Sequence, residues 1–257
     1  MEINLNCDLG EKSIHYSGIN DLKLLKLINT TSIACGYHAG NILTINETLI
    51  NAKKNYVSVG AHPGFQDKKN FGRKKINLTK NELIKLILDQ LEIITEISLF
   101  NNWPITHVKP HGALNNMACE NIEISLVIGK IIKEFNKDLI FVVSPTTQME
   151  TAAKKMKLKY ACEIFADRNY HDNGQLIPRD KKNALILDPI VASKNVLKML
   201  NESSIISYSG KKIKCDIDTI CIHGDNKNAT ILAKELKKIL SINNYNFLNL
   251  NKLSKFN

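Results

Sequence analysis

The sequence has few aromatic residues, no CxxC pair and no apolar run that approaches the length of a membrane span. Aromatic residues make up 6% of its 257 residues, and a transmembrane helix needs about 20 consecutive apolar residues. The first residues, 1–6, do not combine a basic segment with an apolar one, so they lack the pattern of a secretory signal peptide. These absences argue against a membrane protein and predict a cytoplasmic location.

Two common catalytic motifs are absent as well. The chain has no GxxxxGK[ST] sequence, which argues against a P-loop nucleotide site within it. It has no GxSxG sequence either, which argues against a serine hydrolase of the α/β type.

The net charge of +10 does not by itself indicate binding to nucleic acid. The lysines are spread over helix-like segments beside many asparagines, whereas a nucleic-acid surface needs clustered basic residues, often with aromatic residues between them. We therefore predict no nucleic-acid partner. The six cysteines lie mostly in apolar, strand-like stretches, which favours reduced thiols in a core.

Strand-like and helix-like stretches alternate along the chain. We expect strands at 2–9, 32–35, 57–61, 105–109, 139–143, 160–165 and 219–222, and helices at 19–28, 43–55, 79–100, 122–135, 147–156, 189–200 and 229–240. A long polar loop at 169–183 and a hairpin at 205–213 complete the pattern. Alternating strands and helices imply a mainly parallel sheet. About seven such units predict a single domain over residues 1–257, closed into a TIM-like β/α barrel.

The stretch HVKPHGALNN at 107–116 carries two histidines four residues apart. Pro110 makes a helix across this pair unfavourable, which excludes a helical metal motif. On an extended backbone His107, Lys109 and His111 point the same way. We expect the end of a strand to direct these three side chains together, before Gly112 turns the chain. Solvated polar residues at a strand end are the alternative.

Ionisable residues stand at the carboxyl ends of the predicted strands. In a β/α barrel these ends form the face that carries the active site. Five of the seven histidines belong to this set, and packing alone does not explain such a distribution. The set is Asp8, His38, His62, His107, His111, Asp167 and His223.

Carboxylate and imidazole groups suit zinc or another divalent metal, and Asp8, His62 and His111 are the candidate ligands. The alternatives are hydrogen bonding to a substrate and general acid–base catalysis. Asp225 is a further candidate carboxylate.

Four basic residues could bind an anion such as a carboxylate or a phosphate. They are Lys109, Arg73, Arg168 and Arg179. A surface ion pair is the alternative for each arginine, and it is the favoured interpretation for Arg179, which lies in the polar loop.

Read together, eight stretches resemble the LamB/YcsF family. They are NLNCDLGE at 4–11, IACGYHAG at 33–40, GAHPG at 60–64, NFGR at 70–73, HVKPHGAL at 107–114, EIFADR at 163–168, IPR at 177–179 and TICIHGD at 219–225. They follow the family's order and cover nearly the whole chain. Asn115 departs from the pattern, because the family usually has a tyrosine there.

The resemblance implies a seven-stranded β/α barrel of the glycoside hydrolase/deacetylase type. It also implies ATP-dependent opening of 5-oxoproline (pyroglutamate) to L-glutamate, together with the partner 5-oxoprolinase subunits B and C. Because a P-loop is absent, ATP could bind mainly to a partner or at an interface.

With this chemistry, His111 or His62, oriented by Asp8, is expected to act as the general base. Lys109 or Arg168 would hold the substrate carboxylate or the transferred phosphate. The catalytic candidates are therefore Asp8, His62, Lys109 and His111, and the substrate-binding candidates are His38, Arg73, His107, Asp167, Arg168, His223 and Asp225. Two other functions stay open: a stand-alone metal-dependent amide hydrolase or deacetylase, and a non-catalytic ligand-binding subunit.

Overall fold

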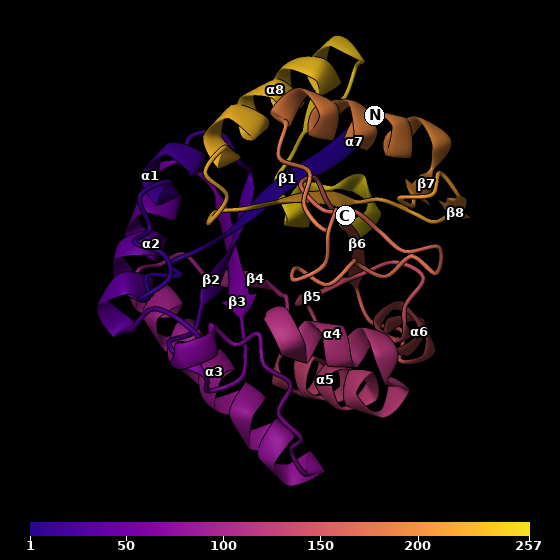
Figure 1. The fold of residues 1–257 in the computed structure, drawn as a ribbon. Helices are drawn as coiled ribbons and strands as arrows, with labels where there is room; N and C mark the ends of the chain where they lie inside the picture. Colours follow the sequence, from indigo (N-terminus) through magenta and orange to yellow (C-terminus); the bar gives the residue numbers. More distant parts are fainter.

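Seven parallel strands close into a barrel in the computed structural model, which describes all residues 1–257 (Figure 1). In order around the barrel they are β1 (Glu2–Leu9), β2 (Thr30–Ala34), β3 (Ser58–His62), β4 (Ile105–Val108), β5 (Ile140–Val143), β6 (Tyr160–Phe165) and β9 (Thr219–His223). The pairing of β9 with β1 completes the ring. The predicted β/α barrel is therefore confirmed.

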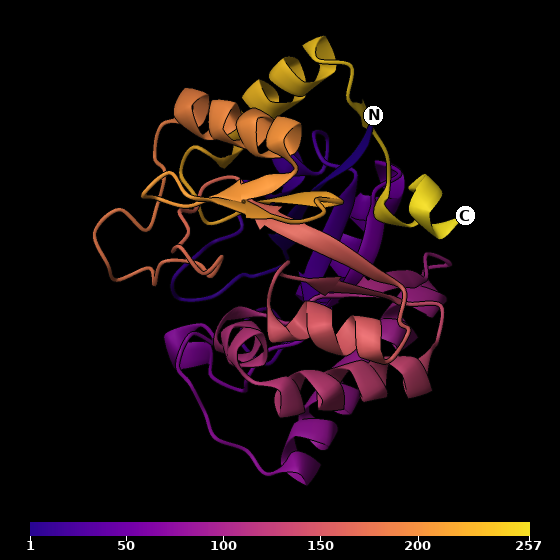
Figure 2. The same cartoon turned by 90° about the vertical axis from the view of Figure 1, so that its right-hand side faces the viewer.

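Helices surround the barrel on its outside (Figures 1 and 2). They are α1 (Asp21–Leu24), α2 (Ile42–Lys54), α3 (Lys80–Phe100), α4 (Gly112–Glu120), α5 (Ile122–Phe135), α6 (Gln148–Lys155), α7 (Pro189–Glu202) and α8 (Ala229–Ile242). The predicted capping box starts α3, where Thr79 and Glu82 bond to each other's backbone N–H groups. No helix combines the length and the apolar character needed to cross a membrane.

The alternation of apolar and polar residues in β1 decides which side chains enter the barrel. Ile3, Leu5, Cys7 and Leu9 belong to the main apolar core, together with buried residues of the surrounding helices. The residues between them bond across the barrel instead: Asn4 to Thr30 and Thr219, Asn6 to Glu163, and Asp8 to Lys109. The interior of the barrel is therefore polar along β1.

The C-terminal segment covers the end of the barrel where the strands begin. It contains β10 (Asn246–Phe247), which pairs with the start of β1, and the short 3-10 helices η2 (Leu250–Lys252) and η3 (Ser254–Phe256). Leu250 and Leu253 pack against Ile140, Val142 and Ala161 in a small apolar cluster. The backbone N–H of Leu250 donates to Thr30 Oγ1 at the start of β2. The sequence pattern did not indicate this closure.

Several predicted elements differ from the observed ones. The helix predicted at 19–28 is only four residues long, α1, because the buried Asp21 side chain accepts from Gly10 N and Tyr16 Oη and holds this segment close to β1. Helix α4 was not predicted. The polar loop after β6 is confirmed, and so is the hairpin, which is formed by β7 (Ser204–Ile206) and β8 (Lys212–Lys214). A third 3-10 helix, η1 (Lys68–Asn70), follows β3.

Replacing Leu250 by alanine tests whether the C-terminal segment is part of one cooperative domain over residues 1–257, which stays a prediction. We expect a single unfolding transition that loses about 2–5 kcal/mol, because truncating a buried leucine removes apolar contacts and leaves a cavity. Urea unfolding followed by Trp103 fluorescence and by circular dichroism measures it.

Leu99→Ala is the control, because Leu99 is 60% exposed and such surface changes stay within about 0.5 kcal/mol. Two separate transitions, or equal effects of the two substitutions, would contradict the expectation.

Candidate functional site

A cavity of about 490 Å³ opens at the carboxyl ends of the strands. The predicted residues that line it are Asp8, His62, Arg73, Lys109, His111, Arg168 and His223. The loop after β6 contributes residues between Gly174 and Asp180 to its wall, among them Arg179. The other predicted residues, His38, His107, Asp167 and Asp225, lie outside the lining. The structure thus brings most of the predicted site together around one space.

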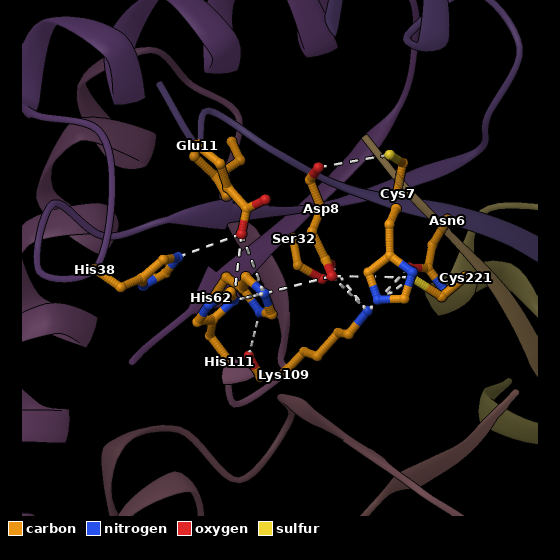
Figure 3. A network of polar contacts seen from close by, with 12 residues as sticks. Asn6, Cys7, Asp8, Glu11, Ser32, His38, His62, Lys109, His111 and Cys221 are labelled. Carbon is orange, nitrogen blue, oxygen red and sulfur yellow. Dashed lines mark hydrogen bonds and ion pairs between the residues drawn. The ribbon is translucent and has the colours of Figure 1, made fainter. Parts of the chain in front are cut away.

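Four buried side chains meet one another, and three of them, Glu11, His62 and His111, also line this cavity (Figure 3 shows the four side chains). Glu11 follows β1, His38 follows β2, His62 ends β3 and His111 precedes α4. One ligand atom from each lies within 4.8 Å of the others. We call these four residues the Glu11–histidine cluster.

Backbone carbonyl groups fix which ring nitrogens of two of these histidines carry protons. His62 Nδ1 lies 2.6 Å from Lys109 O, and His111 Nε2 lies 2.9 Å from Phe71 O. A carbonyl oxygen can only accept, so each of these nitrogens is the donor. In the neutral rings, His62 Nε2 and His111 Nδ1 are then both unprotonated, and they face each other at 3.0 Å. Two lone pairs at this distance call for a cation or a proton between them.

Glu11 and His38 complete the requirement for a cation. Glu11 Oε1 lies 3.3 Å from His111 Nδ1, 3.4 Å from His38 Nε2 and 3.8 Å from His62 Nε2. Neither Glu11 Oε1 nor either ring nitrogen of His38 has a hydrogen-bond partner, although all three atoms are buried. Buried polar atoms in native proteins nearly always have a partner. A metal ion bound by the cluster would supply one.

The protonation states of the cluster fit the same interpretation. Burial lowers the pKa of His62 to about 4 and that of His38 to about 3. Burial opposes ionisation of Glu11, but the adjacent His111 and His38 outweigh it and hold the pKa of Glu11 well below its usual value. At neutral pH the cluster thus offers the Glu11 carboxylate and the neutral rings of His38 and His62, the forms that bind metals. These residues could hold a metal ion.

The position of Asp8 changes the predicted ligand set of Asp8, His62 and His111. Asp8 Oδ2 lies 3.4 Å from His62 Nε2, but Asp8 is outside the Glu11–histidine cluster. Its carboxylate accepts from Lys109 Nζ at 2.9 Å instead. Burial opposes ionisation of Asp8, but the neighbouring His62 and the Lys109 ammonium outweigh it and lower its pKa. Glu11 and His38 take the place in the cluster that was predicted for Asp8.

His107 lies deeper in the barrel than predicted. Its ring packs on Gly60, where no Cβ would fit, and it contacts Ser32 Oγ at 3.3 Å and Thr106 Oγ1 at 3.0 Å. It does not line the cavity, and its expected contact with a substrate stays a prediction. Residues 107, 109 and 111 do share a side of the backbone, but His107 belongs to β4 itself, one step below the rim.

The outer rim of the cavity is rich in arginine. Arg73 Nη2 and Arg179 Nη1 lie 2.7 and 3.7 Å from the same oxygen of Asp225. Arg168 is buried and donates to the carbonyls of Ile177 and Ala184. Burial and the nearby charge of Arg179 lower the pKa of Arg168 to about 10, so it stays charged at neutral pH. Of these, Arg179 was expected to make only a surface ion pair.

Asp167 and His223 form a separate polar pair on this rim. His223 Nδ1 lies 2.7 Å from Asp167 Oδ1, and Asn226 donates to the other oxygen of Asp167 at 3.1 Å. Only His223 of this pair lines the cavity. Asp167 therefore orients His223 and does not line the cavity itself, and its predicted role in substrate binding stays a prediction.

Two buried carboxylates near the site were not among the predicted site residues. Glu11 belongs to the cluster, and Glu163 Oε1 lies 2.9 Å from Lys109 Nζ. Burial raises the pKa of Glu163 to about 7. Glu11 and Glu163 belong to the stretches 4–11 and 163–168, which carry the family resemblance. Their place in these stretches was the only sequence signal that could have indicated them as site residues.

The fold and the site together define a β/α-barrel protein with an enzyme-like site, in which buried carboxylate and imidazole groups face one cavity. Residues 3–255 match the sequence pattern of the LamB/YcsF family. The chain therefore belongs to the LamB/YcsF family, as predicted.

Known relatives cover nearly the whole chain. The 5-oxoprolinase A subunit of Staphylococcus epidermidis is 43% identical over 240 residues, which are 93% of this chain and 95% of that protein. The 5-oxoprolinase A subunit of Staphylococcus aureus is 40% identical over 93% of this chain and 96% of its own.

Solved structures agree with the fold. The lactam utilization protein from Thermus thermophilus superimposes with a TM-score of 0.89 at 33% identity, over 96% of this chain and 99% of that chain. The catalytic domain of a peptidoglycan N-acetylglucosamine deacetylase from Eubacterium rectale matches with a TM-score of 0.51 at 12% identity, over 97% of this chain and 88% of its own. This second likeness concerns the fold alone, and it confirms the predicted barrel type.

Replacing His38 by glutamine should change how stability depends on pH in the metal-free chain. The unfolded His38 binds a proton near pH 6.5, whereas burial lowers its folded pKa to about 3. Between these values acid favours the unfolded state, so wild type should lose up to about 1.4 kcal/mol per pH unit relative to His38→Gln as the pH falls. Denaturant unfolding at several pH values, with a chelator present, measures this. Parallel stability profiles of the two proteins would contradict it.

Proposed function

We propose that this chain is one component of an ATP-dependent 5-oxoprolinase and provides the site where the 5-oxoproline ring is opened to L-glutamate. The relatives named as the A subunit of 5-oxoprolinase support this activity. The observation that carries the proposal is the cavity, where His62, His111 and the arginines of the rim face one space. 5-Oxoproline carries one carboxylate and one lactam, and these arginines and imidazoles suit the two groups.

The reaction needs activation because a lactam is a poor electrophile. Transfer of the terminal phosphate of ATP to the lactam oxygen would activate the ring carbon. Water then adds to this carbon and gives up a proton, the ring C–N bond breaks, and the nitrogen takes a proton. The acyl phosphate that results is hydrolysed by a second water to glutamate and phosphate.

His111 and His62 are the proposed bases for the attacking water. His62 Nε2 and His111 Nδ1 are free to accept a proton, because the other nitrogen of each ring donates to a carbonyl group. Asp8 orients His62. Arg73, Arg168 and Arg179, with Asp225 and His223 beside them, would bind the substrate carboxylate or the transferred phosphate.

Partner subunits are part of the proposal. Because the chain has no P-loop sequence, we place the nucleotide mainly on a partner or at an interface. 5-Oxoprolinase subunits B and C are the proposed partners, and the cytoplasm is the proposed location.

Replacing His111 by alanine should lower turnover by at least about 100-fold, because general-base catalysis typically contributes 10²–10⁴-fold. ATP-dependent release of glutamate from 5-oxoproline, by the chain reconstituted with subunits B and C, is the measurement. His171→Ala is the matched control, because His171 is exposed and lies outside the cavity. Near-normal turnover of His111→Ala would remove His111 from the mechanism.

As an alternative use of the same lone pairs, we propose that the Glu11–histidine cluster binds one divalent metal ion, in which case His62 Nε2 and His111 Nδ1 hold the ion and do not act as bases. The facing lone pairs of His62 and His111 and the unpartnered atoms of Glu11 and His38 support it. Zinc is the best match to three imidazoles and a carboxylate. When bound, such an ion supplies Lewis acidity and lowers the pKa of coordinated water.

Elemental analysis and zinc titration of the purified chain test the metal site. We expect about one ion per chain, and Glu11→Gln or His38→Gln should weaken binding by more than about tenfold, since even the loss of an outer partner costs that much. His171→Gln should bind as wild type does. Equal zinc affinity in all of these proteins would reject the site.

The same experiments separate the alternative functions. A bound metal together with ATP-independent amide hydrolysis by the chain alone would favour a stand-alone amide hydrolase or deacetylase. Binding of 5-oxoproline in calorimetry, without turnover in the presence of the partners, would favour a non-catalytic subunit.

A further inference from the structure

Lys109 finds all of its polar partners inside the barrel. Its Nζ donates to Asp8 Oδ1 on β1 at 2.9 Å, to Cys221 Sγ on β9 at 3.1 Å and to Asn6 Oδ1 at 3.5 Å, and it forms an ion pair with Glu163 Oε1 on β6 at 2.9 Å. An ammonium group has three N–H bonds, and these partners compete with any ligand for them. Lys109 is 4% exposed, and a role as substrate clamp does not fit this arrangement.

The same residue touches His62 from two sides. The carbonyl oxygen of Lys109 accepts from His62 Nδ1 at 2.6 Å. Its ammonium holds Asp8, whose Oδ2 lies 3.4 Å from His62 Nε2. Figure 3 shows Lys109 extending to Asp8 beside His62. The orientation of the His62 ring thus depends on where the backbone and the ammonium of Lys109 lie.

Glu163 fixes the far side of this ammonium. Glu163 is 3% exposed and accepts from Asn6 Nδ2 at 2.9 Å. Asn6 in turn donates to Thr219 Oγ1 at 2.7 Å, so the carboxylate is held by a second strand. Removing one partner of a buried ion pair leaves the other uncompensated and free to move.

We propose that Glu163 is a positioning residue for His62 that acts through Lys109. It holds the ammonium inside the barrel, so that Lys109 keeps its own carbonyl oxygen at His62 Nδ1 and the Asp8 carboxylate beside the His62 ring. Lys109 is then itself a positioning residue, and the binding of substrate anions falls to the arginines of the rim. Where the inference is tested by turnover, it rests on the proposed 5-oxoprolinase function.

A double-mutant cycle tests the route through Lys109. In the complex with subunits B and C, Glu163→Gln should lower kcat by about 10–100-fold, as loss of an outer partner of a site residue typically does. KM should change little, because Glu163 does not line the cavity. In a Lys109→Met background, adding Glu163→Gln should lower kcat no further. Glu163→Asp, which keeps the charge, should restore part of the loss.

Asp218→Asn is the matched control, because Asp218 also pairs with a lysine, Lys255 at 2.7 Å, but lies before β9 at the opposite end of the barrel. It should keep wild-type kcat. A wild-type kcat for Glu163→Gln, or an equal loss in the presence and absence of Lys109, would overturn the proposal.

A second readout does not require turnover. In the isolated chain labelled with ¹⁵N-histidine, Glu163→Gln should shift the His62 ring signals, Asp218→Asn should not, and the shift should vanish in the Lys109→Met background. If this pattern is found but the wild-type complex does not turn over 5-oxoproline, the proposed function fails and the positioning role stands. If His62 does not respond while wild type is active, the positioning role fails. A Glu163→Gln chain that does not fold is replaced by Glu163→Asp in both measurements.

Discussion

The polar side chains that β1 sends into the barrel must find partners there, because an unpaired polar group away from water is costly. Asn4, Asn6 and Asp8 meet this requirement through residues of neighbouring and opposite strands. Most β/α barrels fill their interior with branched apolar side chains. Here hydrogen bonds hold much of the interior instead, and the same bonds place the groups that face the cavity.

Two buried charge systems lie side by side as a result, and His62 belongs to both. On one side the Glu11–histidine cluster combines the Glu11 carboxylate with the neutral rings of His38 and His62. On the other side Lys109 supplies a fixed positive charge between Asp8 and Glu163. The Glu11–histidine cluster suits an exchangeable cation. The group formed by Lys109, Asp8 and Glu163 already contains a cation, the Lys109 ammonium. This division explains why Asp8, although only 3.4 Å from His62, is not available to the cluster.

The sequence was sufficient to predict the barrel and the face that carries the site. Alternation in β1 and the polar residues at strand ends are local signals, and a parallel barrel converts them into a shared position in space. How deep each side chain lies inside the barrel was not predictable from these signals. His107 and Lys109 have the same parity, yet one packs on Gly60 and the other reaches Asp8.

The remaining differences arise from contacts between distant segments. Glu11 joins the site because it lies just after the end of β1 and its carboxylate approaches His38, His62 and His111, which come from other strand ends. The length of α1 depends on a buried Asp21. The C-terminal closure depends on Leu250 and Leu253, and two apolar residues are too few for their spacing to indicate where they pack.

The C-terminal segment closes the barrel at the end where the strands begin. Because Leu250 and Leu253 pack against β5 and β6 there, the cavity opens only at the carboxyl ends of the strands. A reactant must enter and its product must leave through this one opening, one after the other. A protein bound across the opening would therefore have to move away from it in every catalytic cycle.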